Sequence, residues 1–147
     1  MSHTNCLYHI VFSTYHRANT ITHANRESLY RFLWSLITKR KSKLLRINGK
    51  PNHIHILADI HPSLSLAELI AELKRESSKW MKTSGLFPCF EGWGKEYFAT
   101  SKSISDKHIV IEYIKNQVEH HRFHTFEEEM SKLFHDNGWN WDDRPLS

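Results

Sequence analysis

The chain has 147 residues, a formal net charge of +4 and a hydrophobic fraction of 39%, which is typical of one globular domain rather than of a disordered chain. Its two cysteines, Cys6 and Cys89, are too few for a disulfide framework and too far apart for a paired zinc-binding motif. No apolar run approaches the roughly 20 residues of a membrane span, and the N-terminus lacks a signal-peptide pattern. We therefore expect a single domain over residues 1–147, cytoplasmic and without a membrane partner.

The first half of the chain predicts a strand, a helix and two further strands. Residues 6–13 alternate between apolar and other side chains, as a strand does, and residues 25–41 carry leucine and isoleucine at helical spacing. Residues 43–48 and 53–60 read as the second and third strands. Because only a few turn-forming residues separate these two strands, we expect them to be antiparallel.

The second half predicts a helix, a strand and a second helix. Ser65 and Glu68 form a capping box that predicts the start of a helix at this point. The elements expected after it are a glycine-rich loop at 80–95, a strand at 97–101, a helix at 106–121 and a short helix in the tail.

The order of these elements is strand, helix, strand, strand, helix, strand, helix. This order is typical of an α+β fold of the ferredoxin-like or RRM-like kind, in which an antiparallel sheet carries its helices on one face. The other face of the sheet would then be open to a functional site or to a second copy of the chain.

His53 and His55 lie inside the third predicted strand. Side chains two residues apart on a strand point to the same face, so both imidazoles project together while Ile54 faces the core. Two neighbouring imidazoles can bind one divalent cation. The pattern also fits a half-exposed strand that shows two histidines, so the pair alone leaves the function open.

Tyr113 and Gln117 stand four residues apart in the last long predicted helix and therefore share one helix face. A phenol can attack a phosphorus atom, and an amide oxygen can bind a cation. A tyrosine on an amphipathic helix is more often a packing residue, so this pair is also ambiguous by itself.

Taken together, these segments resemble a known family. The HIH strand, the segment WGKEYFATS at 93–101 and YIKNQ at 113–117 are similar to the IS200/IS605-type transposases, which are HUH endonucleases with one tyrosine. The opening YHIVFSTYHR and the ending HTFEEEMSKLFHDNGWNWDDR also resemble this family, so the likeness spans nearly the whole chain.

The resemblance implies a single-strand DNA transposase. Such an enzyme recognises subterminal hairpins and cuts one strand at the element ends. Cleavage forms a 5′-phosphotyrosine and a free 3′-OH, and the phosphotyrosine then serves to rejoin the strand. The resemblance implies that His53 and His55 are metal ligands, that Tyr113 is the nucleophile and that Gln117 is the third metal ligand. It implies Mg²⁺ or Mn²⁺ as cofactor, no nucleotide cofactor, and a homodimer in which the tyrosine helix of one subunit can complete the histidine site of the other.

Basic side chains are expected to contact DNA phosphates. The candidates are Arg17, Arg40, Lys41, Lys43 and Lys50. His9, inside the first predicted strand, is expected to support the sheet or a dimer contact. Two other functions stay open: a domesticated relative that binds hairpin DNA without moving it, and an unrelated ferredoxin-like hydrolase that uses a metal and water on a small phosphoester.

Overall fold

A four-stranded antiparallel sheet forms the centre of the computed structural model, which describes residues 2–117 and 125–139. The strand order across the sheet is β2-β3-β1-β4. The strands are β1 Leu7–Ser13, β2 Lys43–Lys50, β3 His53–Asp59 and β4 Phe98–Lys102, each starting within two residues of its expected position. The α+β class and the antiparallel pairing of β2 with β3 are thus confirmed.

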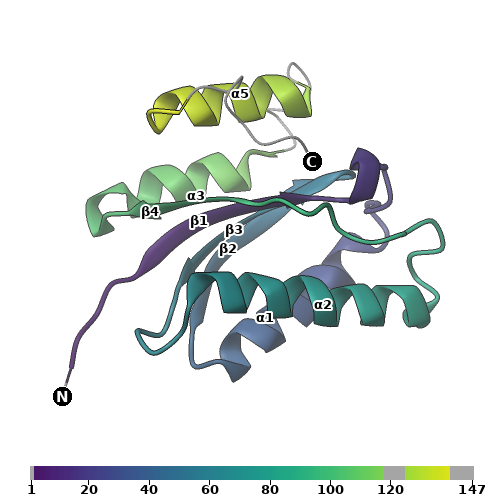
Figure 1. Ribbon diagram of the computed structural model, residues 1–147, viewed down its shortest axis with the longest axis horizontal. Helices are drawn as coiled ribbons and strands as arrows, with labels where there is room; N and C mark the ends of the chain where they lie inside the picture. The colour runs from purple at the N-terminus through teal and green to yellow at the C-terminus, as the bar shows by residue number, and fades with distance from the viewer. Residues whose placement is uncertain (1, 118–124, 140–147) are drawn as a thin grey trace.

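Two long helices, α1 (Arg26–Lys39) and α2 (Leu66–Ser84), cover one face of the sheet (Figure 1). Leu33 and Ile37 of α1 and Leu73 of α2 are completely buried there, together with Ile54 of β3. Each buried aliphatic side chain of this kind contributes about 1.5–3 kcal/mol to folding. This face holds the largest apolar cluster among the described residues and keeps the sheet rigid.

The opposite face, which the sequence analysis left open, is covered by α3 (Lys107–Lys115) and α5 (Phe126–Asp136) (Figure 1). Leu57 of β3 packs against Val110 and Ile114 of α3, and Met130 of α5 packs in a separate cluster with buried residues of β1 and β4. The short apolar stripes of both helices thus find partners on the sheet. Residues 118–121 of the predicted helix 106–121 lie outside the described residues.

The helix α2 extends further than the sequence predicted, since residues 80–84 belong to it and not to a loop. Met81 is buried and continues the inward stripe of Leu73 and Ser77 at intervals of four residues. Gly85 ends the helix in the left-handed conformation, with φ of 80°, as glycine commonly does at this position.

The remaining described elements are short. One turn of 3₁₀ helix, η1 (Tyr15–Arg17), follows β1, and another, η2 (Ile104–Asp106), precedes α3. At the start of α2 the Ser65 hydroxyl accepts a hydrogen bond from the Glu68 backbone N–H, which confirms the predicted cap. Among the described residues, no helix combines the length and the apolar character that crossing a membrane requires.

The β2–β3 hairpin leaves no room for a side chain at Gly49. A Cβ there would lie 2.3 Å from the His53 carbonyl oxygen and 2.8 Å from the Ile54 Cα. We expect Gly49→Ala to lower the free energy of unfolding by about 1–3 kcal/mol, since overpacked cores lose this much. Urea denaturation measures the change, and Lys43→Ala at the exposed start of the same strand serves as the control. Equal stability of Gly49→Ala and the unmodified protein would contradict this packing.

Candidate active site

His53 and His55 project from β3 toward α3 and α5, on the face opposite the α1–α2 layer. The alternation predicted from the sequence is confirmed, because Ile54 packs into the core on the other side. Across the β1–β3 ladder, His55 pairs with Val11 and His53 with Ser13. Both imidazoles have no exposed surface, so the half-exposed strand that the HIH pattern also fits is not the arrangement found.

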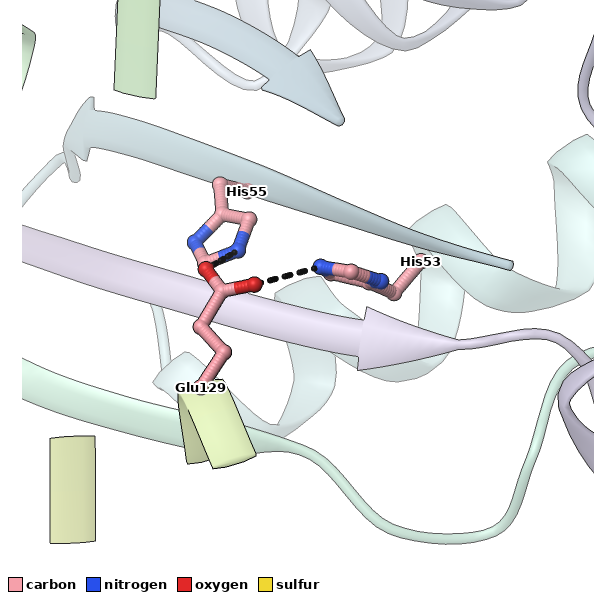
Figure 2. Close-up of side chains that lie close together, drawn as sticks. All are labelled: His53, His55 and Glu129. Carbon is pink, nitrogen blue, oxygen red and sulfur yellow. Dashed lines mark hydrogen bonds and ion pairs between the residues drawn. The ribbon is translucent and has the colours of Figure 1, made fainter. Parts of the chain in front are cut away.

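A carboxylate from α5 meets the two imidazoles (Figure 2). Glu129 places Oε2 3.2 Å from His53 Nε2 and Oε1 2.9 Å from His55 Nε2. One ligand atom from each residue lies within 4.8 Å of the other two. Glu129 reaches this position because Thr125 caps the start of α5 and directs the next turn of the helix onto the sheet.

Hydrogen bonds on the far side of each ring define which imidazole nitrogen faces Glu129. The Nδ1 of His53 lies 2.7 Å from the Asn52 side-chain oxygen, an acceptor, so that nitrogen carries the hydrogen. The Nδ1 of His55 lies 2.9 Å from Nε2 of His9, which is buried and stacked on it. With the Nδ1 hydrogen of His53 on Asn52, the lone pair of that ring lies on Nε2, as metal-binding histidines require. The same holds for His55 in the tautomer that keeps its hydrogen on Nδ1 and donates it to His9 Nε2. His9 thus supports the site, not only the sheet.

In the tautomers with both Nε2 atoms unprotonated, two imidazole lone pairs face the carboxylate and would repel it unless a proton or a cation lay between them. Burial is the main cause that lowers the pKa of His53, to about 4, although Glu129 works in the opposite direction. A second proton on His53 is therefore disfavoured at neutral pH, and the two Nε2 atoms and the carboxylate form a set that a divalent cation can bind. Two nitrogens and a carboxylate oxygen suit Mn²⁺, and they also accept Mg²⁺.

Tyr113 of α3 contacts the same carboxylate. Its hydroxyl donates a hydrogen bond of 2.6 Å to Glu129 Oε1, and its ring meets that of His55 edge-on at 5.6 Å. Burial raises the pKa of the Tyr113 phenol well above its usual range, and the charge and hydrogen bond of Glu129 raise it further. In this arrangement the phenol keeps its proton while the carboxylate is ionised.

Gln117 lies one helical turn beyond Tyr113 and is completely buried. Its side chain interacts with the Tyr113 phenol and partly offsets the rise in that pKa, which agrees with the expected shared helix face. The role of Gln117 as a metal ligand stays a prediction. The acidic group that meets both histidines is Glu129.

The sequence analysis missed Glu129 as a site residue. It is the last of three consecutive glutamates, a run that reads as a solvated first turn of a helix. A signal was present, because Phe126, Met130 and Leu133 are apolar at helical spacing and Glu129 falls within their stripe. An acid inside an apolar stripe indicates a buried carboxylate with a specific partner.

Of the five basic residues expected to contact DNA, two lie near this site. Lys50 ends β2 directly opposite His53, and Arg17 lies over the Phe126 ring at 4.9 Å and pairs with Glu127. The other three are distant. Lys43 starts β2 at its opposite end, close in sequence to Lys41 and to Arg40, which forms a two-point ion pair with Glu72. None of these placements tests DNA contact.

Comparison with known proteins supplies the family. Residues 2–117 match the family model described as "Transposase IS200 like". The chain belongs to the IS200-like transposase family. The transposases for insertion sequence element IS200 of Salmonella typhimurium LT2 and of Salmonella typhi are each 27% identical to it over 126 residues, covering 81% of this chain and 82% of the relative.

Solved structures share the fold. A protein of Deinococcus radiodurans R1 assigned as a transposase aligns with a TM-score of 0.61 at 21% identity, over 79% of this chain and 93% of that one. A REP-associated tyrosine transposase bound to a REP hairpin aligns with a TM-score of 0.59 at 15% identity, over 82% of this chain and 74% of that one.

The contact between Tyr113 and Glu129 makes a prediction about ionisation. Replacing the carboxylate by an amide in Glu129→Gln removes the negative charge that opposes the phenolate, so the pKa of Tyr113 should fall by about one pH unit or more. The Cζ chemical shift of ¹³C-labelled tyrosine, followed against pH in metal-free protein, measures this. The control is Glu127→Gln, an exposed neighbour on α5. An unchanged Tyr113 titration in Glu129→Gln would contradict the contact.

Proposed function

We propose that this protein is a single-strand DNA transposase that cuts and rejoins DNA with Tyr113 as nucleophile and a divalent cation held by His53, His55 and Glu129. The observation that carries the proposal is the shared carboxylate. Glu129 lies against both histidines and also accepts the Tyr113 hydrogen bond. A phenol and a set of metal ligands therefore meet at one point, as attack on a metal-bound phosphate requires. Membership of the IS200-like family supports the same chemistry.

In the cleavage step, the Tyr113 oxygen attacks the scissile phosphorus. The new bond joins phosphorus to the phenol oxygen, the bond from phosphorus to the 3′ oxygen breaks, and that oxygen leaves with the electron pair and takes a proton from solvent to become the 3′-OH. Glu129 Oε1 already accepts the phenol hydrogen and is placed to take the proton. When bound, the divalent cation would withdraw charge from the phosphate and stabilise the transition state.

Rejoining reverses these bonds. A 3′-OH attacks the phosphotyrosine, the phosphodiester re-forms and Tyr113 leaves as a phenol. The phosphoester bond energy is conserved in the covalent intermediate, so strand transfer needs no nucleotide cofactor. Because burial and Glu129 raise the pKa of Tyr113, the phenol keeps its proton while no cation is bound.

The substrate we propose is single-stranded DNA with hairpins near the element ends, bound by a homodimer. The REP-associated transposase, which shares the fold, is bound to a REP hairpin in its structure. Lys50 and Arg17 are the basic residues best placed to contact the strand at the site. Within the described residues, one chain brings Tyr113, both histidines and Glu129 together, so each subunit of such a dimer would hold a complete set.

The nucleophile is tested with single-stranded DNA that spans the ends of the element encoding the chain, labelled at its 3′ end. With Mn²⁺, the unmodified protein should form a covalent adduct that survives denaturing electrophoresis. Tyr113→Phe should lose it by at least about 1,000-fold, the order expected when a nucleophile is removed. Tyr8→Phe, on the core face of β1, is the control. An adduct in Tyr113→Phe would exclude this nucleophile, and cleavage without any adduct would favour a hydrolase that uses water.

The third metal ligand is tested by Mn²⁺ binding, followed by electron paramagnetic resonance. Loss of a ligand in Glu129→Gln should weaken binding by about 100-fold or more, because even outer-shell substitutions cost 10- to 100-fold. The exposed carboxylate of Glu112, one residue before Tyr113, offers the control Glu112→Gln. If Gln117→Ala weakens binding while Glu129→Gln does not, Gln117 is the ligand and the assignment of Glu129 is wrong.

A further inference from the structure

A pocket of about 530 Å³ opens beside the candidate active site, between the end of β1, the segment that leads into β4, and α5. Its floor is apolar and consists of Val11, Phe98, Met130 and Phe134, which pack together as one cluster. A volume of this size lies within the range of pockets that bind small organic groups.

The pocket and the candidate metal site share a wall. Phe126 lines the pocket and also packs against the His53 ring, with 4.7 Å between the ring centroids. Met130 follows Glu129 in α5, and Val11 is the β1 partner of His55. A group bound in the pocket would therefore lie next to whatever the histidines and Tyr113 act upon.

The rim of the pocket carries aromatic rings and cations. Tyr15 and Tyr97 line it with 44% and 43% of their surface exposed, and Arg17 and Lys95 line it as well. Exposed tyrosine rings beside an apolar floor are typical of surfaces that stack unpaired bases, and guanidinium groups bind phosphate. The apolar floor and the tyrosine rings suit the base of a nucleotide, and the cations of the rim suit its phosphate.

The two backbone segments that carry the rim have distinctive local features. His16 and Arg17 both adopt the left-handed conformation, with φ of 55°, which is uncommon for residues other than glycine and occurs often at functional sites. On the other side, the Lys74 ammonium donates to the carbonyls of Gly94 and Glu96 at 3.0 Å and fixes the segment that presents Tyr97.

We propose that this pocket binds one unpaired nucleotide of the strand being cut, with its base on the apolar floor and the tyrosine rim and its phosphate on Arg17. The proposal rests on the proposed function and names a subsite next to its reacting phosphate. Arg17 at present pairs with Glu127. Both side chains are partly exposed, and exposed ion pairs contribute little to stability, so a phosphate can replace this carboxylate.

The test measures binding rather than cleavage, using the full chain as Tyr113→Phe in the absence of metal. Fluorescence anisotropy gives the affinity for a hairpin with a single-stranded flank, in which each flanking base is replaced in turn by an abasic residue. We expect one position at which the abasic residue weakens binding by about 10-fold, as loss of one stacked base does. In Tyr97→Ala and Tyr15→Ala, and most clearly in the double variant, the abasic residue at that position should cost less than in the unmodified rim, because part of the base's stacking surface is already gone.

The matched control is Trp34→Ala, which removes an exposed aromatic ring from α1 on the opposite face and should preserve the abasic effect. Arg17→Gln should reduce the dependence of affinity on salt by about one phosphate contact. If the abasic residue weakens binding equally in the tyrosine variants and in the protein with the unmodified rim, the pocket proposal is wrong but the proposed function is not affected. A protein that binds no single-stranded DNA at all would overturn the proposed function as well, and melting temperatures identify any variant that fails to fold.

Discussion

The carboxylate of Glu129 is the group on which the rest of the site depends. It is buried, and it contacts both histidines and the tyrosine. Burying an ionised carboxylate without compensation is costly, so α5 lies stably on the sheet only if this charge is balanced. The proposed divalent cation would supply that balance and would thereby couple the packing of α5 on the sheet to the assembly of the site.

The sheet positions and orients the side chains of the site. The β1–β3 ladder places His9 where its Nε2 meets His55 Nδ1, and the β2–β3 turn places Asn52 beside His53. Both contacts orient the imidazoles from behind, so the rings present Nε2 without rearrangement. Because α1 and α2 pack the other face of the same strands, the strands that carry this geometry are anchored by the largest apolar cluster among the described residues.

Local periodicity explains what the sequence could predict. The shared face of His53 and His55 follows from the two-residue repeat of a strand, and that of Tyr113 and Gln117 from the helical repeat. The end of α2 was predicted wrongly, because the glycines after it outweighed the inward position of Met81. Glu129, and the contact of His9 with His55, escaped prediction for another reason. Their roles come from contacts between residues 76 and 46 positions apart in the chain, which no local pattern encodes.

The most direct test of the central claim is a crystal structure of the full chain grown with Mn²⁺, with anomalous diffraction data collected at the manganese absorption edge. The account predicts a single strong anomalous peak bonded to Nε2 of His53, Nε2 of His55 and the carboxylate of Glu129, with the Tyr113 hydroxyl facing it. A peak bonded to the histidines and Gln117 with Glu129 turned away would contradict it, as would a structure with no peak between the two imidazoles.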